Sequence, residues 1–136
     1  LENIINASQP DNETRLFKVR LPIDSEWEYA CLAGASTAYH SGDTESDLQA
    51  IGWYSRNSQR RTHPVGMKKP NRWGLYDMHG NVSEWCDNFA RSRSRRIIKG
   101  GAYSDRASRC TASFIDDLRP GSDSKTVGFR IIVTNR

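Results

Sequence analysis

The segment Gly74-Leu75-Tyr76-Asp77-Met78-His79-Gly80-Asn81-Val82-Ser83-Glu84-Trp85-Cys86 is the most informative part of this sequence. Its glycines, aromatic residues and carboxylates follow neither helical nor strand periodicity, which predicts a packed loop with a specific task. Asp77 and Glu84 bracket the backbone carbonyls of Gly80 and Val82. Since calcium takes oxygen ligands, these four residues could bind a calcium ion. The alternative is that Asp77 caps a turn while Glu84 pairs with an arginine.

The composition predicts one domain with a mildly basic surface. The chain has 136 residues, and its 20 basic and 16 acidic residues give a net charge of +4. This balance argues against a dedicated nucleic-acid-binding protein. No apolar run approaches the roughly 20 residues that cross a bilayer. The densest basic run, Arg91–Arg96, is predicted to be a solvated loop, and the alternative is a patch for an acidic ligand.

The N-terminal third of the chain is predicted to contain one strand and one helix. Residues 1–15 are polar and are predicted to be a linker or a frayed N-terminal segment. Alternation predicts a short strand at residues 16–21. Asp24 or Ser25 is predicted to cap the N-terminus of a helix, with Ser25 and Glu28 forming a capping box and Trp27 on the buried face.

The rest of the chain shows little regular periodicity. Residues 35–72 are predicted to be mostly irregular, with one turn of helix near residues 47–50. A connection of this length suggests a fold held by aromatic side chains or ions. One strand is predicted to end at Ile97–Ile98, before the double glycine. Alternating apolar residues predict a final strand at residues 127–133.

Five segments resemble, in the same order, motifs of the formylglycine-generating enzyme (sulfatase-modifying factor) family. They are Arg20-Leu21-Pro22 with Glu26–Ala30, His63–Gly66, Pro70-Asn71 with Gly74–Trp85, Lys99–Gly101, and Gly128–Arg130. The resemblance implies an α+β fold, the formylglycine-generating-enzyme-type variant of the C-type lectin fold, loop-rich with little regular secondary structure. It also implies that residues 16–136 are the C-terminal part of such a domain. A missing N-terminal segment or a second chain would supply the rest.

The same resemblance implies which residues would carry chemistry. In the family, the residues matching Asp77, Gly80, Val82 and Glu84 bind calcium. The enzymes also hold copper through a C-x4-C pair in the loop after the double glycine. Here that loop has one cysteine, Cys110, with Asp105 five residues before it and Ala102 in place of the family's active-site serine. Because copper(I) requires soft thiolate ligands, these degenerate positions predict neither copper binding nor catalysis.

The predicted function is therefore a non-catalytic module that binds a protein, a peptide or a small molecule. Its ligand-binding residues are predicted to be Ser104, Asp105, Arg106, Ser108, Ser113, Asp116 and Asp117. The alternatives are an oxidoreductase of the family with altered chemistry and an accessory fragment of a larger enzyme. Both a bacterial cytoplasmic and an exported location fit the composition.

The cysteines and histidines show no spacing typical of a zinc site. The resemblance implies that Cys31 and Cys110 lie close together, bridged in an oxidising compartment and as thiols in a reducing one. Arg106 and Arg109 are expected to stabilise a thiolate at Cys110. The histidines are expected to be ordinary loop residues; they are His40, His63 and His79.

Overall fold

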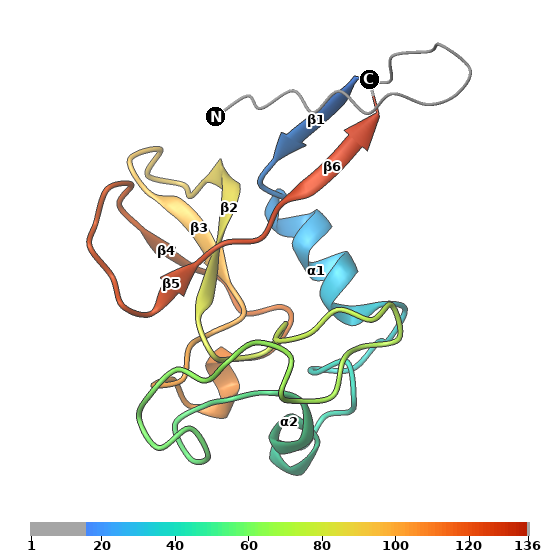
Figure 1. Ribbon diagram of the computed structural model, residues 1–136. Coiled ribbons are helices and arrows are strands. Elements are labelled where there is room, and N and C mark those ends of the chain that lie inside the picture. Colours follow the sequence, from blue (N-terminus) through green and yellow to red (C-terminus); the bar gives the residue numbers. More distant parts are fainter. Residues whose placement is uncertain (1–15, 136) are drawn as a thin grey trace.

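The computed structural model describes residues 16–135, so the predicted linker at residues 1–15 lies outside the described residues. Short helices and strands are separated by long connections, which confirms a loop-rich α+β domain (Figure 1). In chain order the elements are β1 (Phe17–Arg20), α1 (Asp24–Leu32), α2 (Glu45–Ile51), β2 (Ser83–Phe89), β3 (Arg96–Lys99), η1 (Ala107–Arg109), β4 (Asp116–Leu118), β5 (Val127–Gly128) and β6 (Ile132–Asn135). No helix within residues 16–135 is long and apolar enough to cross a bilayer.

The described strands form two sheets. Strands β4, β3, β2 and β5 lie side by side in that order, and β1 pairs with β6 (Figure 1). Strand β3 confirms the strand predicted before the double glycine. Strand β2 runs antiparallel to β3 and parallel to β5, with Glu84 opposite Lys99 on one side and Gly128 on the other. Glu84 therefore lies in an interior strand of the larger sheet, directly after the central loop.

Helix α1 begins at Asp24, one or two residues before the predicted start, and Ile23 rather than Asp24 or Ser25 is its N-cap residue. The carboxylate of Glu26 accepts a hydrogen bond from the backbone N–H of Ile23 at 3.0 Å. The predicted Ser25–Glu28 capping box is wrong, because the Glu28 carboxylate instead lies 3.1 Å from the ammonium of Lys99. This ion pair joins α1 to β3 through a lysine side chain that is 0% exposed.

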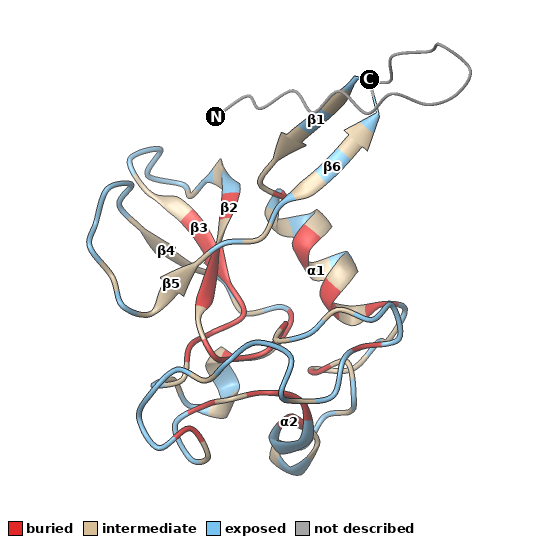
Figure 2. Ribbon diagram, in the orientation of Figure 1, coloured by how far each residue is buried: buried red, intermediate tan, exposed pale blue. Residues whose placement is uncertain are grey.

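The buried positions, red in Figure 2, include two clusters of packed apolar residues. The first includes Trp27, Cys31, Met78, Cys86, Ile97 and Ala112. The second includes residues of α2, and its members are Tyr39, Leu48, Ile51, Tyr54 and Cys110. His79 is 0% exposed, and its Nε2 lies 3.3 Å from the Cys31 thiol while its Nδ1 lies 2.7 Å from the Cys110 carbonyl. The expectation of an ordinary loop histidine is therefore wrong for His79, because its ring joins the two clusters.

The connection between α1 and β2 is ordered mainly by side-chain contacts. Helix α2 is longer than the predicted single turn, and the Thr44 hydroxyl caps it by accepting a hydrogen bond from the Asp47 N–H at 3.2 Å. Farther along, the Trp53 ring stacks on His63 with 3.8 Å between the centroids, and the Lys68 ammonium lies 4.1 Å from the Trp53 ring centroid. Aromatic contacts therefore help to hold this long connection, as the sequence suggests.

The predicted single strand at residues 127–133 is wrong. The chain pairs with β2 as β5, leaves the larger sheet, and then pairs with β1 as β6. Phe129, Ile131 and Val133, which the alternation assigns to one face, are 69%, 53% and 56% exposed. Arg130 is the more enclosed residue, with its side chain 24% exposed, because its guanidinium pairs with the buried carboxylate of Glu84.

Candidate functional site

The central loop, residues 74–82, makes a tight turn into β2. Asp77, Gly80 and Asn81 have φ angles of 55°, 83° and 65°, which lie in the left-handed region. A Cβ atom on Gly80 would lie 2.1 Å from the Trp53 carbonyl oxygen, so this position requires glycine. The Asn81 N–H donates to the same carbonyl at 2.7 Å. The loop is thus fixed against the backbone of Trp53.

The carboxylate of Asp77 is only partly satisfied. Its Oδ2 accepts a hydrogen bond from the Gly66 N–H at 2.8 Å. Its Oδ1 is buried and has no hydrogen-bond partner within residues 16–135. An unsatisfied buried acceptor costs roughly 1–3 kcal/mol. A bound cation would remove this penalty.

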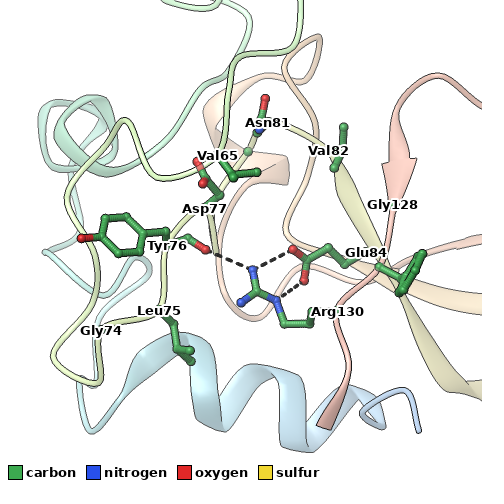
Figure 3. A pocket seen from close by; sticks show the side chains of 12 residues that line it. Val65, Gly74, Leu75, Tyr76, Asp77, Asn81, Val82, Glu84, Gly128 and Arg130 are labelled. Carbon is green, nitrogen blue, oxygen red and sulfur yellow. Dashed lines mark hydrogen bonds and ion pairs between the residues drawn. The ribbon is translucent and has the colours of Figure 1, made fainter. Parts of the chain in front are cut away.

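The carboxylate of Glu84 is held by Trp27 and by Arg130, and Figure 3 shows the contact with Arg130. The indole Nε1 of Trp27 donates to Oε2 at 2.6 Å, and Arg130 donates to Oε2 at 2.5 Å and to Oε1 at 2.8 Å. Arg130 also donates to the Tyr76 carbonyl at 3.1 Å. Burial disfavours the charged guanidinium, but the hydrogen bonds and charge of Glu84 hold the pKa of Arg130 above its usual value.

The predicted calcium ligands Asp77, Gly80, Val82 and Glu84 line one open cavity of about 590 Å³ (Figure 3). Within residues 16–135, no group of three or more His, Cys, Asp or Glu side chains is placed to hold a metal. A cation here would therefore depend on backbone carbonyls as well as on the two carboxylates. The unsatisfied Oδ1 of Asp77 fits such a cation. Oε1 of Glu84 also fits, since a carboxylate oxygen accepts more than the single bond from Arg130.

The loop after Gly100-Gly101 uses its polar groups to stabilise itself. The Oδ2 atom of Asp105 accepts a hydrogen bond from the Ala102 N–H at 2.9 Å, and its Oδ1 lies 3.2 Å from Nε of Arg109. The Ser55 N–H donates to the Asp105 carbonyl at 2.9 Å. Asp105 is thus part of the turn itself.

The thiol of Cys110 is enclosed in the second cluster. Cys110 is 0% exposed, and a Cβ atom on Gly101 would lie 2.7 Å from its Sγ. Burial and the charge of Asp105 raise the pKa of Cys110 to about 12, against the opposing charge of Arg109. Of the two arginines expected to stabilise a thiolate, Arg109 does lower this pKa, but the loss of solvent outweighs its charge, so the thiol stays protonated.

The residues predicted to bind a ligand fall into two groups. Four are exposed, namely Ser104, Arg106, Ser108 and Ser113. The three aspartates are in ion pairs: Asp105 and Asp116 with Arg109, and Asp117 with Arg95. Arg109 therefore ties the loop to β4 and gives the exposed residues a fixed frame.

Cys31 and Cys110 are not bridged. Both are buried free thiols, as is Cys86. The imidazole of His79 lies between the Cys31 thiol and the backbone carbonyl of Cys110. The two cysteines thus belong to different clusters and are connected through His79.

Comparison with known proteins identifies the family. A sequence model of the sulfatase-modifying factor enzyme 1-like domain matches residues 5–135. The chain belongs to this family. The match includes the central loop and the segment after the double glycine, so both features described above belong to the family domain.

Members of the family with different names resemble this chain. The formylglycine-generating enzyme of Streptomyces coelicolor is 30% identical over 145 residues, which cover 82% of this chain and 45% of that enzyme. The chaperone protein LppX of Paenibacillus barcinonensis is 27% identical over 135 residues, 83% of this chain and 48% of that protein. The structure of Treponema denticola variable protein 1 has a TM-score of 0.82 at 32% identity, covering 91% of this chain and 49% of that chain. This chain therefore spans about half the length of these relatives.

Two residues of the site are not identified by sequence reasoning. The sequence assigns Trp27 to the core. The alternative in which Glu84 pairs with an arginine is confirmed, but the sequence does not say that this arginine is Arg130. Both bind the carboxylate of Glu84. The sequence signal that could identify this contact is the place of Arg130 within an apolar run, because a buried arginine requires an acidic partner.

Proposed function

We propose that residues 16–135 act as a non-catalytic ligand-binding module of the sulfatase-modifying factor family. The observation that supports this most directly is the state of Cys110, the cysteine of the loop after the double glycine. Its thiol is buried, has a pKa of about 12 and packs against the backbone of Gly101. Because copper(I) binds soft sulfur ligands as thiolates, an enclosed protonated thiol is a poor ligand.

The residues around Cys110 support the same proposal. Asp105 offers hard oxygen atoms rather than sulfur, and these atoms already bind the Ala102 N–H and Arg109. Ala102 is 1% exposed and carries no hydroxyl group. A second soft ligand is absent from residues 100–110. Oxygen-dependent chemistry at a cysteine pair therefore has no basis in this loop.

The proposed ligand surface consists of Ser104, Arg106, Ser108 and Ser113. These side chains are exposed on a loop whose frame is fixed by ion pairs of Arg109. Exposed loops on a rigid frame are typical of binding surfaces. The similarity to a protein named as variable supports a surface whose residues can change without loss of the fold. The ligand would be a protein, a peptide or a small molecule with hydrogen-bonding groups.

A pair of substitution libraries tests this proposal. In one library the four surface positions are randomised together. In the matched library the ion-paired Asp105, Arg109 and Asp116 are randomised with buried Asn71, whose side-chain amide donates to the carbonyls of Ala30 and Cys31. Most surface variants should keep an unfolding free energy within roughly 1 kcal/mol of the parent, since isolated surface substitutions have small effects. Most framework variants should unfold. Thermal melting of sampled variants measures both, and binding of selected surface variants to immobilised proteins shows that the surface can hold ligands.

Two results would reject the proposal. One is a surface library that unfolds as often as the framework library, because the four positions would then be structural. The other is copper- and oxygen-dependent loss of mass from a cysteine peptide of the sulfatase type, well above a copper-only control. That product would show catalysis.

We propose, in addition, that calcium binds at the cavity of the central loop. The ligands would be the carboxylates of Asp77 and Glu84 and the carbonyls of Gly80 and Val82. Trp27 and Arg130 would orient Glu84, as outer-shell partners commonly orient a metal ligand. Bound calcium would supply a positive charge for the unsatisfied Oδ1 of Asp77 and would crosslink the turn.

The calcium proposal predicts a melting temperature that depends on the ion. At a calcium concentration of 100 times Kd, the folded state gains about 2.7 kcal/mol. Asp77→Gly removes a ligand without left-handed strain and should abolish this gain, whereas the exposed control Asp123→Asn should keep it. Equal melting of the parent in calcium and in chelator contradicts the proposal.

A further inference from the structure

The hairpin between β2 and β3 is an arginine-rich surface feature outside the site described above. Its sequence is Ala90-Arg91-Ser92-Arg93-Ser94-Arg95. The Ala90 N–H donates to the Arg95 carbonyl at 2.8 Å, and the Arg93 N–H donates to the Ala90 carbonyl at 2.9 Å. Arg93 has a φ angle of 51°. These bonds give the tip of the hairpin a defined turn.

Two arginines anchor this hairpin to the sheet. Arg95 forms an ion pair with Asp117 of β4 and donates to the Asp117 carbonyl at 2.7 Å. Arg96 pairs with Asp87 at 2.9 Å, and its guanidinium lies 4.5 Å from the centroid of the Phe89 ring. The base of the hairpin is therefore held by charge-assisted bonds to the neighbouring strands.

The arginines at the tip, Arg91 and Arg93, are exposed. Neither Arg91 nor Arg93 pairs with a carboxylate within residues 16–135. Both line an open cavity of about 640 Å³ together with Phe89 and Ala90. Phe89 is 51% exposed. The cavity thus combines two uncompensated guanidinium groups with an exposed apolar wall.

We propose that this hairpin docks an acidic peptide segment of a partner protein. Guanidinium groups bind carboxylates through paired N–H donors, which gives the surface its preference for aspartate and glutamate. The phenyl ring of Phe89 and the methyl group of Ala90 favour a segment that also carries an apolar side chain. A purely anionic polymer or a lipid headgroup would leave this apolar wall unused. An acidic peptide with apolar residues matches both parts of the surface.

The test uses a short fluorescein-labelled peptide in which glutamates alternate with leucines, and a second peptide with glutamine in place of glutamate. Fluorescence anisotropy measures their binding to the protein at low and at physiological salt. The glutamate peptide should bind, with affinity falling as salt rises. The glutamine peptide should bind at least about tenfold more weakly, which corresponds to 1.4 kcal/mol.

Matched variants separate this hairpin from general electrostatic attraction. The double variant Arg91→Gln with Arg93→Gln should weaken binding of the glutamate peptide about tenfold or more. The control is the double variant Arg60→Gln with Arg61→Gln, at two exposed arginines, which changes the net charge equally. This control should change binding by less than about twofold. Phe89→Ala should weaken binding of the glutamate peptide. It should leave binding of heparin, a purely anionic polymer, unchanged.

Three outcomes would overturn the proposal. The first is no detectable binding of the glutamate peptide at low salt. The second is an equal loss for both arginine pairs, which would indicate net charge rather than a site. The third combines two results: Arg91 and Arg93 are needed for binding of heparin or of phosphatidylserine vesicles, and Phe89→Ala leaves binding of the glutamate peptide unchanged. That result would assign the hairpin to a polymer or a membrane surface instead.

Discussion

Acidification is expected to destabilise this fold through His79. The ring is fully buried, its Nδ1 lies 2.7 Å from the Cys110 carbonyl, and its Nε2 accepts the His40 N–H at 3.2 Å. These partners assign a neutral ring with the proton on Nδ1, because a carbonyl only accepts and a backbone N–H only donates. A second proton would be placed on Nε2, facing the His40 N–H. The folded state therefore resists protonation of His79.

The size of the effect follows from the pKa. Burial, together with nearby His40, lowers the pKa of His79 from 6.5 to about 4, although the hydrogen bond to Cys110 opposes this change. The unfolded state takes up the proton near pH 6.5 and the folded state near pH 4. Stability is thus fully present above pH 6.5, falls by about 1.4 kcal/mol per pH unit below it, and levels off below about pH 4. The total loss is roughly 3 kcal/mol.

Urea unfolding between pH 7.5 and 4.5, followed by tryptophan fluorescence, measures this slope. The range avoids most of the titration of Glu26, whose pKa is lowered to about 2 by its hydrogen bonds from Arg20 and Ile23. The pKa of His40 is also lowered by burial, so His40→Gln should remove a smaller part of the slope. His79→Gln should remove the larger part, even though it lowers stability at every pH. A variant slope equal to that of the parent would refute the reasoning.

Three further predictions concern packing and the thiols. Gly80→Ala should lower the free energy of unfolding in urea by more than about 2 kcal/mol, because the new Cβ would clash with the Trp53 carbonyl. The control Gly74→Ala has a similar φ but nothing within 4 Å of its Cβ, so it should cost about 1 kcal/mol. Equal losses would contradict the clash. Trp27→Phe should cost roughly 1–3 kcal/mol by removing a donor to buried Glu84, and an unchanged unfolding midpoint would show that this bond is not needed. The cysteines are buried with pKa values raised by burial, so iodoacetamide at pH 8 should add mass only after unfolding; labelling of the native protein would show that a thiol is accessible.

The sequence predicts the elements whose signals are local. Helix α1 and β3 are found because their patterns lie within a few residues. The central loop is found because its motif is dense and matches the family. The break between β5 and β6 is missed, because alternation from Val127 to Val133 does not show that the chain changes sheets after Gly128.

The contacts that define the site are missed for a related reason. Arg130 and Glu84 are 46 residues apart, and Trp27 and Glu84 are 57 residues apart. The sequence around Glu84 does not specify Arg130 or Trp27 as its partners, and the sequences around those residues do not specify Glu84. The pairing therefore depends on the register of the larger sheet. The burial of His79 is likewise set by packing of three distant segments rather than by its own loop.

Strands β1 and β6 pair in antiparallel register, with Phe17 opposite Asn135. The two ends of the described residues thus lie side by side, with paired α-carbons about 5 Å apart. A unit with adjoining ends can be inserted into a surface turn of another protein without forcing that turn apart. The exposed loop around η1 lies at the other end of the molecule from this pair (Figure 1). Attachment to a longer polypeptide through β1 and β6 would therefore leave the proposed ligand surface facing away from the host.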